Sequence, residues 1–280
     1  MGRKKKFTVG DAVIYIVFVL VALFIIVPIY KVLVDSLDLK SGYGMRLWPE
    51  QFSFLGYKII LTTKSLYKPF LVSVYVTVVG TLLGLTLVTL GAYVLIQWEM
   101  PGRNFFSYFL LFTMIFDGGM IPTYLVMRQL KLINTLWAVI LPGSMSVYNL
   151  VLMRNFFEGI PGSLLEAAQI DGCSPMGIFV KVVLPLSKAA LASIGLMFGV
   201  SFWNTYTNFK LYISNRDLYN FQMKLRDMIQ GSDMVQTSES IATNTLNNAA
   251  VIVAILPFMI IYPFCQNYFV QGVNVGAVKE

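Results

Sequence analysis

The sequence contains no histidine among its 280 residues. This absence excludes a histidine general base, a Ser-His-Asp triad, a Cys-His pair and any metal site that needs an imidazole ligand. The two cysteines, Cys173 and Cys265, are too few for a disulfide framework, a zinc site or an iron–sulfur site. Charged residues make up only 12% of the chain, about half of their usual share in a soluble domain. The sequence therefore lacks both the residues of most enzyme classes and the surface of a soluble globule.

Apolar residues stand where those charges are missing: 57% of the chain is hydrophobic and its mean hydropathy is +0.70. A bilayer core about 30 Å thick needs about 20 mostly apolar residues in a helix. Six such runs predict an all-α membrane protein with six transmembrane helices. The runs lie near Ala12–Tyr30, Phe70–Ile96, Phe105–Met127, Thr135–Phe157, Ala189–Tyr206 and Ala249–Phe269.

The basic residues at positions 3–6 indicate the orientation of these spans. Positive residues beside the first helix resist translocation, so we expect a cytoplasmic N-terminus, and six spans return the C-terminus to the cytoplasm. The first run is longer than the apolar part of a signal peptide and no A-x-A site follows it, which favours a true span. Basic residues in the long first and last outer loops run against the positive-inside rule. They are Lys40, Arg46, Lys58, Lys64, Lys68, Lys210, Arg216, Lys224 and Arg226.

Glycine and proline interrupt four of the expected spans. They occur as Asp117-Gly118-Gly119 with Pro122, as Pro142-Gly143, as Gly195 with Gly199, and as Pro257 with Pro263. These residues either kink helices so that they pack, or free backbone groups that line a polar path. Asp117 favours the polar path, because an ionisable residue at membrane depth usually faces protein or water. Near the outer rim of the bilayer the same residue would need no special role.

The loop between the fourth and fifth spans carries two helix-start signals. Ser163 and Glu166 have the spacing of a capping box, and Gly172 is suited to end that helix in a left-handed conformation. Ser174-Pro175 predicts a second start and Leu184-Pro185 a stop. Two such short helices are marginal alone. Their partner is either a docked protein or the ends of the spans themselves.

The spacing of this loop resembles that of a known family. Glu166-Ala167-Ala168, then Gly172, then Leu184-Pro185 resembles the EAA loop of ABC importer permeases, with Val182 where the consensus has isoleucine. Further stretches resemble the maltose-type carbohydrate permeases, and the resemblance spans roughly Trp48 to the end. They are Pro101-Gly102-Arg103, Leu132-Ile133-Asn134-Thr135, Ser201-Phe202-Trp203-Asn204, Tyr268-Phe269-Val270-Gln271-Gly272 and Gly276-Ala277-Val278-Lys279. Residues 118–124 and 218–226 are most similar to the subfamily that handles complex or uronate-containing oligosaccharides.

The resemblance implies the type I, maltose-type permease fold and a subunit of an ATP-driven, binding-protein-dependent importer of carbohydrate, specifically an oligosaccharide. It implies a basic cytoplasmic N-terminus (1–11), a first transmembrane helix (12–34), an extracytoplasmic loop (35–69), a permease core (70–270) with the EAA loop (158–185), and a cytoplasmic tail (271–280). The implied partners are a second permease, two ATP-binding subunits, an extracytoplasmic solute-binding protein and the lipid bilayer. The other basic residues are scattered, which argues against nucleic acid as a partner.

In that family the EAA loop forms a coupling helix held in a cleft of the ATPase. Carried over, the coupling residues are Glu166, Ala167, Ala168, Asp171, Gly172, Leu184 and Pro185. Glu166 then has two compatible roles, helix capping and ATPase contact. The sequence has no G-x-x-x-x-G-K-[ST] loop, so we expect no enzyme activity, no metal site and no cofactor in this chain, with ATP and Mg²⁺ bound by the partner ATPase.

Aromatic faces and planar amide or carboxylate groups bind sugars, and such residues occur near the broken helices and the outer end of the fifth span. The candidate substrate-pathway residues are Asp117, Tyr124, Tyr148, Asn149, Trp203, Asn204, Tyr206 and Asn208. The alternative is that the aromatic residues anchor helices at the membrane interface. In the family a companion permease also carries substrate contacts.

Two other classes compete with the importer permease. A secondary transporter or channel would act without an ATPase and would need buried ion-coupling carboxylates, for which only Asp117 is a candidate. A membrane-embedded enzyme would need a catalytic set that the spans do not contain. We therefore expect a multi-pass protein of the bacterial cytoplasmic (inner) membrane, with both termini in the cytoplasm.

Overall fold

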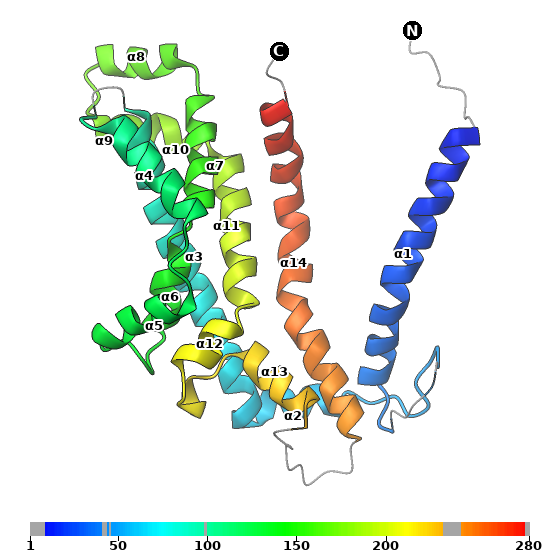
Figure 1. Cartoon of the computed structure of the whole chain (residues 1–280). Coiled ribbons are helices and arrows are strands. Elements are labelled where there is room, and N and C mark those ends of the chain that lie inside the picture. Colours follow the sequence, from blue (N-terminus) through cyan, green and yellow to red (C-terminus); the bar gives the residue numbers. More distant parts are fainter. Residues whose placement is uncertain (1–8, 41–43, 45, 98–99, 232–241, 278–280) are drawn as a thin grey trace. The chain divides into compact units, whose positions relative to one another are not determined.

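The computed structural model describes residues 9–40, 44, 46–97, 100–231 and 242–277, and these fold almost entirely into helices (Figure 1). Within that part of the chain the β-type pairing is one isolated bridge between Asp38 and Phe52. The basic cluster at positions 3–6 and the side chain of Cys265 lie outside the described residues. The elements are α1 (Val9–Ser36), α2 (Leu55–Thr62), α3 (Lys64–Ile96), α4 (Arg103–Ile115), α5 (Met120–Gln129), α6 (Trp137–Ser144), α7 (Val147–Glu158), α8 (Gly162–Ile170), α9 (Pro175–Ile178), the π-helix η1 (Phe179–Val183), α10 (Leu184–Leu186), α11 (Lys188–Trp203), α12 (Thr207–Tyr212), the 3₁₀-helix η2 (Arg216–Leu218), α13 (Phe221–Ile229) and α14 (Thr243–Ala277).

Three described helices are long and apolar enough to cross a bilayer. They cover Gly10–Ser36, Lys64–Ile96 and Thr243–Phe264. Two bent helix pairs pass the same test together: α4 with α5, bent by 113°, and Pro175–Leu186 with α11, bent by 80°. Length and composition therefore allow up to five spans among the described residues. The count of six stays a prediction.

Two of the expected spans are not single helices. The run predicted at Phe105–Met127 breaks after Ile115, and α5 begins directly after Gly119. Gly119 has a φ of +84°, a conformation that glycine adopts without steric cost. The run predicted at Thr135–Phe157 is divided between α6 and α7, because Met145 and Ser146 are extended. The glycine and proline signals thus mark a true break in the third run, and the fourth breaks just after its Pro142-Gly143. The interruptions expected in the fifth and sixth runs are wrong, because α11 continues through Gly195 and Gly199 and α14 continues through Pro257 and Pro263.

The contacts divide the chain into two compact units, residues 1–67 with 225–256 and residues 68–224 with 257–280. In the first unit, Asp38 organises the segment that follows α1. The residue is 2% exposed, and its carboxylate accepts the backbone N–H groups of Lys40 (3.2 Å), Glu50 (3.1 Å) and Gln51 (3.3 Å). Its carbonyl accepts the Thr245 hydroxyl at 2.6 Å. One buried acid therefore holds the loop closed and ties it to the start of α14.

We expect this loop to open at acid pH. Burial alone would raise the pKa of Asp38, but the three amide hydrogen bonds, helped by Arg46, hold it below its ordinary value of 3.8. The folded state thus favours the carboxylate, so its stabilisation is present at neutral pH and is lost as pH falls through the lowered pKa. Asp38→Asn should speed hydrogen exchange at the amides of residues 40, 50 and 51, because the free energy of opening the loop should fall by about 1–3 kcal/mol. Unchanged exchange there, matching an Asp227→Asn control in the same unit, would contradict this role.

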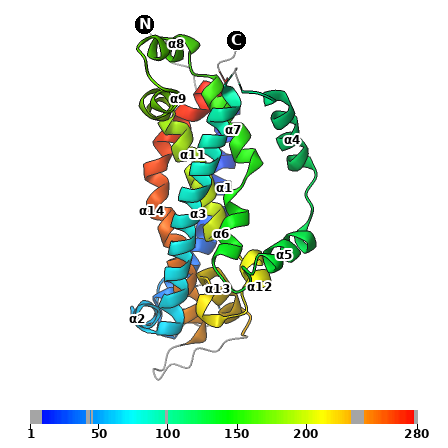
Figure 2. The ribbon, with the colours of Figure 1, turned by 90° about the vertical axis from the view of Figure 1, so that its left-hand side faces the viewer.

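In the second unit α3, α6, α7 and α11 run side by side (Figures 1 and 2). The tip of the Phe202 ring sits between two glycines of neighbouring helices. A Cβ on Gly80 would lie 2.5 Å from its Cζ, and a Cβ on Gly143 would lie 2.7 Å from its Cε1. The ring is 4% exposed, so it cannot swing away from one glycine without meeting other packed atoms. Close approach of α3, α6 and α11 therefore depends on these glycines.

Gly143→Ala should destabilise the purified protein by about 1–3 kcal/mol, because the new methyl group overpacks the Phe202 site. Gly199→Ala is the matched control, since its nearest contact is the Thr81 hydroxyl at 3.8 Å. Adding Phe202→Leu should relieve the Gly143→Ala defect in a double-mutant cycle measured by thermal unfolding in detergent. If Gly143→Ala is as stable as the control, the Phe202 ring does not limit how closely the helices pack at Gly143.

Candidate functional site

Helix α8 is the element predicted to carry the coupling residues, and its start differs from the prediction. It begins at Gly162 behind Pro161, with no side-chain hydrogen bond at its cap. Ser163 lies inside the first turn, so the expected capping box with Glu166 is wrong. Pro161 fixes the extended backbone that precedes the helix, and the cap lies at Pro161, two residues before the Ser163 that the sequence signal indicated.

The C-terminal end of α8 confirms the role predicted for Gly172. This glycine has φ +78°, and its N–H donates to Gln169 O at 3.0 Å. The N–H of Cys173 donates to Ala168 O at 3.0 Å. Together these two bonds form a Schellman motif, in which a left-handed residue satisfies the last helical carbonyls. A Cβ at Gly172 would meet no atom within 4 Å, so the strain of a substitution comes from backbone conformation and not from crowding.

The second helix of the loop starts as predicted and ends later. Ser174 caps it by accepting the Gly177 N–H at 3.2 Å, and Pro175 occupies the first turn. The stop predicted at Leu184-Pro185 lies close to the observed end: the helix continues one residue further, to Leu186, and bends by 80° at Ser187. The π-helix η1 lies directly before this proline. Its wider turn spreads the carbonyls that a proline would otherwise strike in a regular helix.

The two helices of the loop have different surroundings. Ile178, Phe179 and Val183 are buried against the core of their own unit, and the Tyr93 ring packs on Phe179 at 4.8 Å between centroids. The Tyr93 hydroxyl donates to the Pro175 carbonyl at 2.7 Å. Of the two partners left open by the sequence, the protein's own spans therefore hold this second helix.

Helix α8, all of whose residues are described, has no buried side chain. It lies at the end of its unit (Figures 1 and 2), where Leu165 and Ala168 are partly buried against the core. Its apolar residues Leu164 and Ile170 are 45% and 86% exposed. Among the predicted coupling residues, Glu166, Ala167, Asp171, Gly172 and Pro185 are exposed, and Ala168 and Leu184 are half-buried. The loop thus presents one short helix with an unpaired apolar edge.

The candidate pathway residues between the breaks have mainly local contacts. Asp117 is exposed in the linker between α4 and α5 and accepts the Gly119 N–H at 2.9 Å, which satisfies a backbone group at the break. On α7, Tyr148 is exposed and Asn149 is 6% exposed. The Asn149 N–H donates to the capping hydroxyl of Ser146 at 3.3 Å.

The residues after α11 divide into packed and accessible ones. Trp203 is 3% exposed and makes edge contacts with the rings of Phe70 and Phe258, so packing accounts for its position. Asn204 is exposed and donates to Val200 O at 3.0 Å. Asn208 is half-buried. The four residues predicted as one cluster therefore do not share one environment.

Aromatic rings and a cation come together on α5 and α12. The rings of Tyr124 and Tyr212 stack at 6.2 Å with an angle of 9°, and Lys210 Nζ lies 5.7 Å from the centre of the Tyr206 ring. Asn134 joins the loop after α5 to the loop after α12. Its N–H donates to Tyr212 O, and its Oδ1 accepts the N–H groups at positions 214 and 215. Asn134 thereby gains a structural role that the sequence indicated only through a family-like motif.

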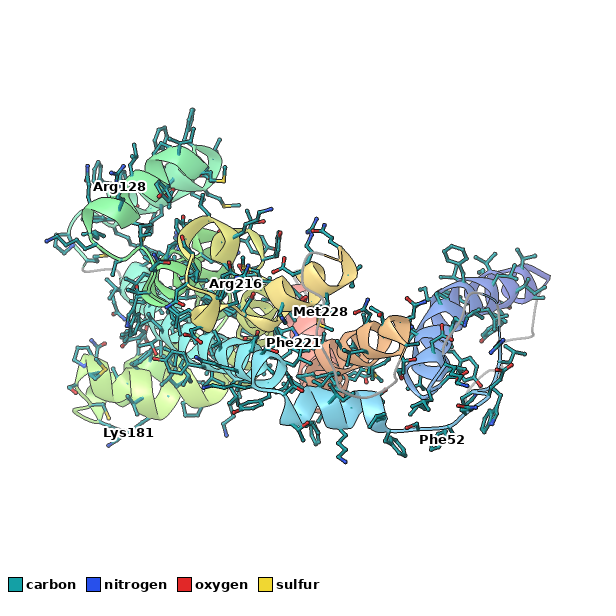
Figure 3. The ribbon with its side chains drawn as sticks, turned by 90° about the horizontal axis from the view of Figure 1, so that it is seen from below. Phe52, Arg128, Lys181, Arg216, Phe221 and Met228 are labelled. Atoms are coloured by element: carbon teal, nitrogen blue, oxygen red, sulfur yellow. The ribbon has the colours of Figure 1, made fainter. Side chains whose placement is uncertain are left out.

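The sequence reasoning missed a group of cations at this end of the unit. Six basic side chains and two acidic ones, Asp117 and Asp217, occur at this end, counted over residues 116–136, residues 204–224 and Lys68. Lys68 pairs with Asp217 at 2.6 Å. The exposed cations with no ion pair among the described residues are Arg128, Lys131, Lys210 and Arg216, of which Arg128 and Arg216 are labelled in Figure 3. The signal in the sequence was the excess of basic residues on the outer loops, which was interpreted only in terms of topology.

Among the described residues, no three Cys, Asp or Glu side chains gather as metal ligands. Apolar spanning helices together with an exposed EAA-type loop define the membrane subunit of a transporter. The chain belongs to the family described as the binding-protein-dependent transport system inner membrane component, whose model matches residues 1–275. It is therefore a multi-pass permease component of the inner membrane, and this family of ABC transporter permeases is generally not catalytic in itself.

Individual relatives agree with this assignment. The chain is 38% identical over 279 residues to the polygalacturonan/rhamnogalacturonan transport system permease protein YtcP of Bacillus subtilis (strain 168), covering 96% of this chain and 98% of that one. It is 27% identical over 290 residues to the arabinooligosaccharides transport system permease protein AraQ of Halalkalibacterium halodurans, covering 99% of each.

A solved structure supports the fold. A chain in the crystal structure of a bacterial ABC transporter involved in the import of the acidic polysaccharide alginate matches with a TM-score of 0.87 and 29% identity, covering 95% of this chain and 100% of that chain. The all-α permease fold predicted from the sequence is thus confirmed.

Proposed function

We propose that this chain is one of two permease subunits of an ATP-driven importer of uronate-containing oligosaccharides. Two ATP-binding subunits bind ATP and Mg²⁺ and hydrolyse the nucleotide, and an extracytoplasmic binding protein delivers the sugar. Both termini lie in the cytoplasm, in keeping with the basic residues at positions 3–6. The observation that carries the proposal is the exposed helix α8, whose apolar edge has no cover in its own unit.

The geometry of the loop suits a coupling role. The second helix is anchored to the core through Tyr93, whereas α8 presents Leu164 and Ile170 outward with Glu166 and Asp171 beside them. A short amphipathic helix of this kind fits a groove in a partner protein. The contact surface is formed by α8 and the turn that ends it, with the residues Glu166, Ala167, Ala168, Asp171 and Gly172. Leu184 and Pro185 shape the bend that leads into α11.

Ile170→Ser should weaken coupling, because Ile170 is the most exposed apolar side chain of α8 and would bury in the ATPase groove. We expect ligand-stimulated ATP hydrolysis by the reconstituted complex to fall about tenfold, the equivalent of roughly 1.4 kcal/mol of lost contact. Leu186→Ser, which also removes an exposed apolar side chain but lies outside the loop, is the matched control. Equal ATPase activity in the two variants would remove Ile170 from the coupling interface.

The opposite end of the same unit suits an acidic sugar. Tyr124 and Tyr206 offer rings, Asn204 and Asn208 offer amides, and four exposed cations lie in the same segments. The other pathway candidates are Asp117, which has a local role, Asn149 and Trp203, which are buried, and Tyr148, which is exposed on α7. Two relatives whose names or titles mention polygalacturonan/rhamnogalacturonan and alginate support an acidic substrate. Cations with no ion pair among the described residues attract carboxylates and raise the local concentration of an anionic substrate.

The test is uptake of oligogalacturonate into proteoliposomes that hold both permeases and the ATPase, with the binding protein outside. Lys210→Gln with Arg216→Gln should lower uptake of the acidic oligosaccharide about tenfold at low salt, and less at high salt because charge attraction is screened. Lys188→Gln, a cation at the other end of α11, should have no effect.

Two outcomes would overturn parts of the proposal. Uptake by this chain without the ATPase would favour a secondary transporter or channel. If the complex takes up only neutral oligosaccharides in an ATP-dependent way, and the double variant does not change this uptake, the importer assignment stands and the uronate assignment is wrong.

A further inference from the structure

A pair of side-chain amides lies at the end of the second unit that carries Lys210 and Arg216, and one of the two has no role in the sites described above. Asn204 directly follows α11 and is exposed, and Gln222 lies in the first turn of α13 and is half-buried. Gln222 Nε2 donates to Asn204 Oδ1 at 3.5 Å, the long limit of a hydrogen bond. The two amides are 18 positions apart in the sequence, so the fold brings them together.

The backbone beneath both amides is fixed by a buried asparagine. Asn220 is 1% exposed, and its Oδ1 accepts the Met223 N–H at 3.0 Å, which caps the first turn of α13. Its Nδ2 donates to Thr205 O at 2.6 Å, in the turn directly after Asn204. One side chain therefore joins the residue that follows Asn204 to the helix turn that carries Gln222.

Helix α3 also holds the start of α13. The Phe221 N–H donates to the Ser73 hydroxyl at 2.9 Å, and Phe221, which is labelled in Figure 3, is 1% exposed. The Phe70 ring makes edge contacts with the rings of Phe221 and Trp203, at 5.7 Å and 5.6 Å between centroids. Polar and apolar contacts thus fix the backbone on both sides of the amide pair. A ligand that binds there has little chain to order, which lowers the cost of binding.

The two amides keep most of their hydrogen-bonding capacity. An amide has two N–H donors and two lone pairs on its oxygen. Besides its contact with Gln222, Asn204 donates from Nδ2 to Val200 O at 3.0 Å. Within the part of the chain that the structure describes, these contacts leave each amide one N–H and at least one lone pair. A donor beside an acceptor matches neighbouring hydroxyl groups on a sugar ring, because each hydroxyl both donates and accepts.

We propose that Gln222 is a specificity-determining residue, which together with Asn204 binds neighbouring ring hydroxyls of the transported oligosaccharide. This inference rests on the proposed function and divides the recognition of the sugar between two kinds of group. The cations Lys210 and Arg216 attract the carboxylates, and the amide pair binds the uncharged part of the ring. Tyr206, whose ring lies 5.7 Å from Lys210 Nζ, is two residues from Asn204, so a ring, a charge and an amide occur within one short segment. Salt screens the attraction of the cations and leaves neutral hydrogen bonds unchanged.

The experiment measures the binding of trigalacturonate and of its carboxyl-reduced, neutral form to the assembled complex in nanodiscs, without the binding protein, by saturation-transfer NMR titration. Gln222→Met keeps the length of the side chain and removes its amide. We expect this variant to raise the dissociation constants of both sugars about fivefold, at low and at high salt, because a neutral hydrogen bond is lost. Gln230→Met is the matched control, since Gln230 is exposed just past the end of α13, and it should change neither constant.

The outcomes separate this inference from the proposed function. If the wild type binds the sugars and Gln222→Met binds them equally well, Gln222 is not part of the sugar route, and the proposed function stands. A lower melting temperature of Gln222→Met with unchanged dissociation constants would give the amide pair a structural role only, which also contradicts the inference. A loss that affects trigalacturonate alone and disappears at high salt would show a charge effect and exclude recognition of the hydroxyls. If the wild type binds neither sugar, the proposed substrate class is wrong and the inference fails with it.

Discussion

The structure depends on one constraint: inside a bilayer every backbone N–H and C=O group needs a partner within the protein. Each helix break in the described apolar segments shows how that constraint is met. Asp117 accepts the N–H of Gly119 at the α4–α5 break, and Ser146 accepts the N–H of Asn149 at the α6–α7 break. At the bend before α11, the Ser187 N–H reaches both Val183 O and Leu184 O. Small polar side chains beside the breaks therefore serve the backbone first, which explains why Asp117 has a local partner.

The same requirement shapes the loop that carries the EAA motif. The Schellman motif at Gly172 satisfies the carbonyl end of α8 from within the loop, so the helix can stand away from the core without exposed orphan carbonyls at that end. Leu165 and Ala168 of α8 pack against the core, and Leu164 and Ile170 stay exposed. The helix that follows buries Phe179 and Val183, and its first carbonyl is taken by Tyr93. The exposed helix α8 thus ends in a turn that satisfies its own carbonyls, and this turn leads into a helix that is packed on the core.

Local signals were readable from the sequence, and tertiary ones were not. Gly172 and Ser174-Pro175 are confirmed because a left-handed glycine and a serine cap depend on a few adjacent residues. The capping box failed because Pro161 had already fixed the start of α8. The stop at Leu184-Pro185 is confirmed to within two residues by the bend at Ser187. Trp203 is predicted as a pathway residue or as an anchor at the membrane interface, whereas Phe70 and Phe258, which are distant in sequence, pack against its ring in the core. The cations at Arg128 and Lys210 were visible, but only the fold brings their loops together through Asn134.

The two ends of α8 are joined to the unit by different contacts, and this difference bears on how motion passes through the permease. The N-terminal link, residues 159–162, contains two glycines beside the rigid Pro161, and no side chain donates or accepts a hydrogen bond at the helix cap. The C-terminal link is one tight turn between the Schellman motif and the Ser174 cap, and it joins a helix held by Tyr93. A displacement of α8 should therefore reach the core through α9 and η1 more than through α7. Because η1 leads directly into the bend at Ser187, the stiff route ends on α11, the helix whose Phe202 ring packs against Gly80 and Gly143.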